Sequence, residues 1–599
     1  MTRSVERGAH VPGLDGLRMI AVVAVIVYHL DAPWLPGGFL GVDVFFVISG
    51  YLITSQLWAR AADRGHVDLT GFWLARARRL LPALAAMLLA TSLAQTLLDR
   101  PGLRAYLGDL GAAATYTSNW WYVLHERSYF DAIGRPPALQ HLWSLAVEEQ
   151  FYLAWPLIVA GTLLLTSRSA RRRTLLAVCG VGAVASALVM GLGSWRTGAP
   201  LDADASRFYF GTDSHATGLL VGAALAVCRD GAGFGAARPA LAPARPWLTA
   251  LGAFTLLGIV AVFVRVDAFS TALYRVGFAL VALATTLVVA VATRPGPLAR
   301  LLEHSLATAI GRRSYGLYLW HWPVFVFTRP RLDVPLHGAA DVALRLGLLA
   351  AVSEASYRFV EQPVRRAGLR RTWRELPGLY ARPAVLMAAS SALLVPITIA
   401  TSTPTAAEVS AAARLARLAE GARHPQPSAS ASRRHTISRA HTRNLTLAVY
   451  GDSFAIGVEP DLLRSFASVE VHAAIGEQPW TMVDQLAAEA TTISADVVLI
   501  HIGNNGIVDR ARLEGAIARI PATTSVVVAV PRVPRSWGAP NVTALRRLAH
   551  ETPRVHLLDW YAATDGRPDF VVADGVHPTS AGGRAYVRLL QEVLARPAT

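Results

Sequence analysis

The feature of this chain that most limits its fold is a series of apolar runs, each about as long as a membrane crossing. A bilayer core about 30 Å thick needs about 20 mostly apolar residues in a helix. Residues 1–402 offer eleven such candidate spans. The series predicts an all-α polytopic domain. The centres of the spans lie near Val25, Phe46, Leu89, Leu153, Val184, Leu219, Phe254, Val281, Leu319, Leu349 and Ser390.

Charge and composition agree with a membrane protein. Hydrophobic residues make up 53% of the chain and charged residues 16%, which is apolar for a soluble protein. The net charge of +16 comes from arginines that cluster in alternate connections between the apolar runs, so it acts as a topology signal and predicts no nucleic-acid partner. The positive-inside rule predicts a multi-pass protein of the cytoplasmic membrane, with the N-terminus in the cytoplasm and, after eleven crossings, the C-terminal part outside.

The C-terminal third of the chain has a different pattern. Residues 403–443 are rich in Ala, Ser, Pro, Thr and Arg, which is typical of a linker. Residues 444–596 then alternate short apolar strands with helical patterns, which predicts a parallel sheet covered by helices on both faces. We expect strands at 445–450, 469–475, 496–502, 525–530 and 555–558.

This α/β region carries residues suited to nucleophilic catalysis. Ser453 directly follows the first strand and would lie at the carboxyl edge of the sheet, where such folds bind ligands. A serine nucleophile needs a base and an orienting carboxylate. His577 and Asp574, three residues apart, can supply them. We therefore predict a triad of Ser453, His577 and Asp574.

An oxyanion hole is expected at the same edge. It would consist of the backbone N–H groups of Ser453 and Gly476 with the side chain of Asn505. Asn505 is chosen over its neighbour Asn504 by its spacing from Gly503.

Ionisable residues inside the apolar runs mark a second candidate site. Arg18 and His29 are eleven positions apart, so in a helix they share one face about 16 Å apart. His29 is suited to act as a general base and Arg18 to bind a phosphate of a cytoplasmic donor. Arg18 can equally place its charge at the membrane interface. Glu148 also needs a polar partner at its depth, and can either orient His29 or form a structural contact between helices.

Several motifs in this part of the chain occur in a fixed order: Gly13-Leu-Asp-Gly-Leu-Arg18, then His29, Gly41-Val-Asp-Val-Phe-Phe-Val-Ile-Ser-Gly-Tyr51, Arg76-Ala-Arg-Arg79, His141-Leu-Trp-Ser-Leu-Ala-Val-Glu-Glu149, Tyr209-Phe-Gly-Thr-Asp213, Ser314 to His321, and Glu361-Gln-Pro363. Over roughly residues 11–366 they resemble the acyltransferase-3 family of membrane acyltransferases. The resemblance implies an acyl-CoA donor, usually acetyl-CoA, that is used from the cytoplasmic side as a substrate, with no bound cofactor and no metal.

The same resemblance assigns roles to individual residues. It implies that Arg18 and His29 are central catalytic positions and that Arg76 and Arg79 help to hold the donor, although these two arginines also fit plain positive-inside charge. Secondary candidates are Asp43, Asp213 and His321, whereas His215 stands where the family pattern has Arg.

The C-terminal set of Ser453, Gly476, Asn505 and His577 resembles the SGNH hydrolases, a family with a three-layer, flavodoxin-like α/β fold, over roughly residues 444–596. Gly506 departs from the Gly-x-Asn-Asp of many members and resembles the variant that follows an acyltransferase-3 region. The fused arrangement implies O-acetylation of a bacterial cell-envelope glycan.

The sequence therefore predicts an acyltransferase-3 domain at 11–366, an eleventh helix at 383–402, a linker at 403–443 and an SGNH domain at 444–596. The predicted function is O-acyl transfer from cytoplasmic acyl-CoA to a hydroxyl of an extracytoplasmic glycan, through an acyl-enzyme at Ser453. Two alternatives stay open at this point: an outer domain that is an acetyl esterase, and a glycan or lipid transporter with an outer binding module.

Overall fold

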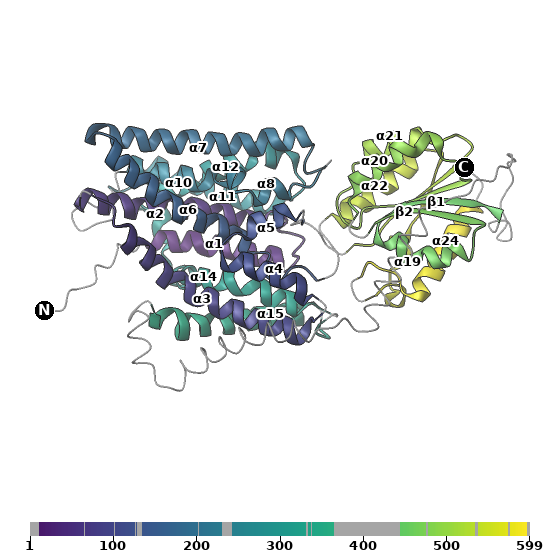
Figure 1. Ribbon diagram of the computed structural model, residues 1–599, viewed down its shortest axis with the longest axis horizontal. Coiled ribbons are helices and arrows are strands. Elements are labelled where there is room, and N and C mark those ends of the chain that lie inside the picture. The colour runs from purple at the N-terminus through teal and green to yellow at the C-terminus, as the bar shows by residue number, and fades with distance from the viewer. Residues whose placement is uncertain are drawn as a thin grey trace. The chain divides into compact units, whose positions relative to one another are not determined.

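The computed structural model describes residues 11–364 and 444–595, except for the short segments 65, 101, 126, 128–134, 202, 230–241, 331–332, 337, 475–476, 534–536 and 573–574. The chain divides into a helical unit and an α/β unit, which are described separately (Figure 1). The expected eleventh helix at 383–402 and the linker at 403–443 lie outside the described residues.

The helical unit is built mainly from long apolar helices. Each of the ten predicted centres from Val25 to Leu349 lies inside one of them. By length and hydropathy, five helices of the described ranges are apolar enough to cross a membrane: Gly38–Ala61, Leu69–Leu98, Arg168–Thr197, Pro246–Arg265 and Leu273–Ala292. The ten helices are α1 (Pro12–His29), α2 (Gly41–Arg64), α3 (Leu69–Leu98), α6 (Leu142–Leu165), α7 (Arg168–Thr197), α10 (Thr217–Cys228), α11 (Pro246–Arg265), α12 (Phe278–Ala292), α14 (Ser305–Phe327) and α15 (Ala339–Ala355).

Shorter helices occupy several of the connections. The connection near Trp120 contains two that the hydropathy pattern did not predict, because neither is long enough for a span: α4 (Leu103–Ala114) and α5 (Ser118–Leu124). They are joined by a hydrogen bond of 2.9 Å from Trp121 Nε1 to the buried Asp109 Oδ1. The remaining short elements are η1 (Gly38–Leu40), α8 (Ser206–Phe210), α9 (Thr212–His215), η2 (Leu273–Gly277), α13 (Pro297–Leu302) and η3 (Ser356–Glu361).

Burial separates the helices into central and peripheral ones. The apolar window of α2 is 83% buried, whereas that of α11 is only 22% buried. Outward-facing side chains such as Leu165 and Phe254 are 87% and 75% exposed, as expected for residues that contact lipid. The central α2 packs closely on α10, because a Cβ atom at Gly50 would collide with the carbonyl oxygen of Leu219. This contact holds α2 at the centre of the bundle.

The α/β unit confirms the predicted parallel sheet. Its strands are β1 (Thr446–Gly451), β2 (Ser468–Ala473), β3 (Val497–His501), β4 (Ser525–Ala529) and β5 (Val555–Leu558), in the order β2-β1-β3-β4-β5. Every pairing is parallel. This is the flavodoxin-like order, in which the chain reverses direction across the sheet between β1 and β3.

Helices cover both faces of the sheet (Figure 1). One face packs on α20 (Pro479–Glu489), α21 (Arg510–Ala518) and α22 (Gly538–Glu551), and the other on α19 (Ser453–Leu463) and α24 (Ser580–Leu594). The smaller elements are η5 (Ala490–Thr492), α23 (Trp560–Ala563) and η6 (Pro568–Phe570). Because Gly451 of β1 is in register with His501 of β3, the loops that follow these two strands leave the sheet side by side.

Candidate active site

Ser453 and His577 meet at the carboxyl edge of the sheet, as predicted. Ser453 is the first residue of α19, and its Oγ lies 2.8 Å from His577 Nε2. The loop that carries His577 is held by a hydrogen bond of 2.8 Å from Val572 N–H to the His577 carbonyl. This distance allows Ser453 to donate its proton to the imidazole. The predicted orienting residue Asp574 and the oxyanion residue Gly476 lie outside the described residues.

The two neighbouring asparagines after β3 have different partners. Asn504 Nδ2 donates to both carboxylate oxygens of Asp452, at 2.8 and 2.9 Å. Asn505 Nδ2 donates to the Glu477 carbonyl at 2.9 Å, in the loop that follows β2. Both asparagines are buried. The structure thus ties Asn504 to the residue before Ser453, and Asn505 to the loop that also contains Gly476.

Asp452 is a residue to which the sequence analysis gave no role. Its carboxylate caps α19 by accepting from Phe454 N–H at 2.9 Å, besides its bonds from Asn504. Burial raises the pKa of Asp452 to about 6, opposed by these hydrogen bonds and by the nearby imidazole of His577. The one feature of the sequence that could have indicated a role for Asp452 is its position directly before Ser453.

Asn541 on α22 is a second residue that the sequence did not reveal. It is fully buried, and its Nδ2 donates to the carbonyls of Gly503 and Gly506 at 3.0 and 2.8 Å. Its Oδ1 accepts from Val508 N–H at 2.9 Å. Gly503 has a φ of 101°, so this loop adopts a backbone conformation that a side chain would disfavour. Asn541 therefore fixes the loop that presents Asn505.

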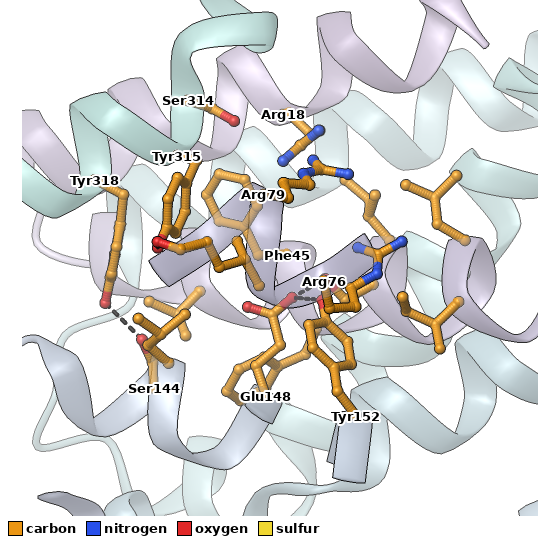
Figure 2. Close-up of a pocket in the computed structure, with 18 residues that line it drawn as sticks. Arg18, Phe45, Arg76, Arg79, Ser144, Glu148, Tyr152, Ser314, Tyr315 and Tyr318 are labelled. Carbon is orange, nitrogen blue, oxygen red and sulfur yellow. Dashed lines mark hydrogen bonds between the residues drawn. The ribbon is translucent and has the colours of Figure 1, made fainter. Parts of the chain in front are cut away.

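A pocket in the helical unit brings together four of the predicted residues (Figure 2). Arg18 comes from α1, Arg76 and Arg79 from α3, and Glu148 from α6. In this view Glu148 lies between Arg76 on one side and Ser144 on the other. Three guanidinium groups around one pocket provide positive charge and hydrogen-bond donors of the kind that bind anions.

Two of these groups, Arg76 and Glu148, have polar or aromatic partners nearby. Arg76 Nη2 donates to Gln56 Oε1 at 3.0 Å, and its guanidinium lies 5.5 Å from the centre of the Tyr152 ring. Glu148 Oε1 accepts hydrogen bonds from the hydroxyls of Ser49 and Tyr152. Glu148 therefore has its polar partners on α2 and on its own helix.

His29 lies away from this pocket, at the end of α1. Its Nδ1 is 3.2 Å from Nε2 of His321 on α14, and its ring packs against Trp322. The expectation that Glu148 orients His29 is not supported, because Glu148 lines the pocket and bonds to hydroxyls on α2 and α6, whereas His29 is not part of the lining. The structure pairs His29 with the secondary candidate His321 instead.

A third histidine, which the sequence analysis did not single out, joins this pair. The ring of His141 is centred 5.5 Å from that of His321, and its Nε2 lies 3.0 Å from the Leu319 carbonyl. Its Nδ1 is buried, with no hydrogen-bond partner among the residues that the structure covers. Three imidazoles thus cluster at this end of α1.

The two aspartates named as secondary candidates lie outside the pocket lining. Asp43 Oδ1 lies 2.8 Å from Nε2 of His215, and both residues are buried. His215, which departs from the family pattern, thus has a buried partner of its own. Asp213 forms a two-pronged ion pair with Arg207, at 3.1 and 2.8 Å.

Comparison with known proteins finds one matching family and several similar chains. A family model described as an acyltransferase domain matches residues 11–352. A peptidoglycan O-acetyltransferase of Listeria monocytogenes, OatA, is 30% identical, with 98% of each chain covered. Among solved structures, the C-terminal catalytic domain of Streptococcus pneumoniae OatA with a methylsulfonyl adduct is 17% identical and has a TM-score of 0.23, covering 26% of this chain and 93% of that one. A lipase/acylhydrolase from Enterococcus faecalis is 18% identical and has a TM-score of 0.22, covering 25% and 95%.

The family match spans more than half of the chain, and the Listeria relative spans nearly all of it. The chain therefore belongs to the acyltransferase-3 family, as a multi-pass membrane O-acetyltransferase whose helical part is followed by an α/β domain.

Proposed function

We propose that this protein moves an acetyl group from cytoplasmic acetyl-CoA across the membrane to a hydroxyl of extracytoplasmic peptidoglycan. The observation that carries the proposal is the 2.8 Å contact between Ser453 Oγ and His577 Nε2 at the carboxyl end of β1. The name of the Listeria relative supports peptidoglycan as the acceptor. The arginine distribution supports a cytoplasmic N-terminus, eleven crossings and an outer α/β domain.

The donor half of the reaction belongs to the arginine pocket. Coenzyme A carries several phosphate oxygens, and guanidinium groups bind phosphate through paired, charge-assisted hydrogen bonds. Arg18, Arg76 and Arg79 supply three such groups around one pocket. The donor binds there as a substrate and leaves as free coenzyme A.

His29 serves the passage of the acyl group outward. Its contact with His321 gives a pair of imidazoles that can share one proton at the end of α1. The pair lies about 16 Å along the helix from Arg18. It can therefore act as a base at a point beyond the donor pocket.

The acceptor half takes place at Ser453. His577 takes the hydroxyl proton while Ser453 Oγ attacks the acyl carbon, and it passes that proton to the delivering group as this group leaves and the acetyl-enzyme forms. Asn505 and the backbone N–H groups of Ser453 and Gly476 stabilise the oxyanion, and Asp574 orients the imidazole. A glycan hydroxyl then gives its proton to His577 and attacks the ester, and His577 returns that proton to Ser453 Oγ as the ester bond breaks.

Mass spectrometry of peptidoglycan fragments tests this function. Cells that contain the protein should carry O-acetyl groups that are missing from cells without it, and Ser453→Ala should match the cells without it. Higher acetylation in the absence of the protein would instead identify the outer domain as an esterase. Unchanged acetylation of peptidoglycan, with a change in another envelope glycan, would overturn the acceptor and leave the transfer chemistry intact.

A further inference from the structure

The donor pocket contains a serine beside a carboxylate. The Ser49 hydroxyl on α2 donates to Glu148 Oε1, and both residues line the pocket. The Tyr152 hydroxyl donates to the same carboxylate oxygen and lies 3.1 Å from Ser49 Oγ. A serine becomes a competent nucleophile when an adjacent base can take its proton. Ser49 and Glu148 form such a pair.

The position of Ser49 is well defined by packing. The next residue, Gly50, lies so close to α10 that a Cβ atom would collide with the Leu219 carbonyl. On the facing helix, a Cβ atom at Gly222 would collide with the Val47 carbonyl. These close contacts fix the rotation of α2. Ser49 itself is only half-buried, since it faces the pocket.

The other two serines of the pocket lack a base. Ser144 Oγ lies 2.6 Å from the Tyr318 hydroxyl (Figure 2). The Tyr318 hydroxyl itself donates to the His141 carbonyl. The Ser314 hydroxyl has no partner among the residues described by the structure. Ser49 is the pocket serine that contacts a carboxylate.

The arginines would place a thioester beside this pair. Arg18, Arg76 and Arg79 line the same pocket as Ser49, and they provide the positive charge that attracts an anionic donor. The rest of the lining near Ser49 is apolar, with Phe45, Ile48 and Leu52 from the same helix. The lining therefore combines an anion site with an uncharged region that suits an acyl chain.

We propose that Ser49 is a transient acyl acceptor and that Glu148 is its general base. This rests on the proposed function, in that acyl-CoA is the donor. Ser49 Oγ forms a bond to the acyl carbon, the thioester C–S bond breaks, and Glu148 passes the serine proton to the leaving thiolate. The products are an ester on Ser49 and free coenzyme A.

The ester on Ser49 is resolved by a second hydroxyl group. This acceptor attacks the acyl carbon, Glu148 takes its proton, and the same proton returns to Ser49 as the ester bond breaks. Tyr152 keeps the carboxylate in place through both steps.

Full-length protein in detergent, with Ser453→Ala to block the outer step, provides the test. After incubation with acetyl-CoA and rapid quenching, the peptide that contains Ser49 should carry one acetyl group that hydroxylamine removes. Ser49→Ala in the same background should carry none, and Glu148→Gln should carry at least tenfold less. Ser55→Ala is the matched control, because Ser55 is a buried serine on the same helix that does not line the pocket. It should keep the label.

The outcomes separate this inference from the proposed function. Release of coenzyme A with no acetyl on Ser49 would overturn the acyl-serine and leave the donor assignment intact. Normal acetylation of glycan by the Ser49→Ala variant with Ser453 intact would also overturn the acyl-serine and leave the donor assignment intact. If the protein with intact Ser49 releases no coenzyme A from acetyl-CoA, the donor assignment fails and the inference fails with it. Acetyl-CoA binding, measured by thermal shift, verifies that Ser49→Ala is folded.

Discussion

Ser453 Oγ lies 2.8 Å from His577 Nε2, although the two residues are 124 positions apart in the chain. The contact joins the first turn of α19 to the loop before α24. It gives the α/β unit a nucleophile and a base in direct contact, and it provides the first prediction.

Ser453→Ala should lower both ester hydrolysis and glycan acetylation by about 10³-fold or more, because it removes the nucleophile. The protein should stay folded, since the change deletes one partly exposed hydroxyl and leaves no cavity in the core. Activity of full-length protein on a soluble acetyl ester, with glycan acetylation in cells, measures the effect. A variant that still acetylates glycan would mean that the helical unit delivers acetyl directly.

His29→Ala should abolish glycan acetylation in cells but leave hydrolysis of a soluble acetyl ester by the same full-length variant unchanged. The physical reason is that His29 contacts His321 in the helical unit, whereas hydrolysis of the ester uses Ser453, His577 and other groups of the α/β unit. Comparison of the two activities in one preparation provides the measurement. Equal loss of both activities would argue against separate half-reactions.

Arg79→Gln should raise the KM for acetyl-CoA about tenfold, which corresponds to about 1.4 kcal/mol of lost binding. Arg79 supplies one of the three guanidinium groups that line the pocket, and Arg18 and Arg76 remain in the variant, so we expect a partial loss of binding. Arg78→Gln is the matched control, because Arg78 is exposed and does not line the pocket. If both variants raise KM alike, the effect comes from general positive charge and not from a phosphate site.

The pKa of Asp452 predicts a pH-dependent stability of the α/β unit. Burial raises this pKa from 3.8 to about 6, so the folded state binds the proton more tightly than the unfolded state does. Protonated Asp452 therefore adds about 3 kcal/mol to the free energy of unfolding. This contribution is fully present below about pH 4 and is lost as pH rises through about 6. Asp452→Asn retains an acceptor oxygen but cannot titrate. As pH rises from about 4 to about 6, the unfolding temperature of the α/β unit should decrease in the unsubstituted protein relative to Asp452→Asn. Calorimetry of the two full-length proteins measures this difference. If the unfolding temperatures of the two proteins change with pH in parallel, Asp452 is not the group responsible.

Asn541→Ala should destabilise the α/β unit by about 3 kcal/mol, because it leaves buried backbone groups of the 503–508 loop without partners. It should also lower kcat for a soluble ester more than it changes KM, since the loop presents Asn505 and not the substrate's binding surface. Thr543→Ala on the same helix is exposed and should leave both quantities unchanged. Loss of stability with an unchanged kcat would limit Asn541 to a structural role.

The five strands and ten of the helix positions could be predicted because they depend on local patterns. Strand and helix periodicity are set by which neighbouring residues are apolar, and each described strand begins within one residue of its predicted start. Parallel strands also bring their carboxyl ends to one edge, so Ser453 and the loop of Asn505 could be placed together from chain order alone. The short α4 and α5 were missed because their apolar content is too limited to mark a span.

The polar pairs inside the helical unit could not be predicted in the same way. His29 and His321 are 292 positions apart, and Ser49 and Glu148 are 99 apart. Each pair depends on how two helices rotate about their axes and cross, and this is decided by side-chain packing over the whole interface. The sequence by itself thus determined the helices and strands, their order along the chain, and which candidate catalytic residues stand at the ends of these elements. Only the tertiary structure decided that Glu148 meets Ser49 and not His29, because a shift of one residue around a helix turns a side chain by about 100° toward a different neighbour.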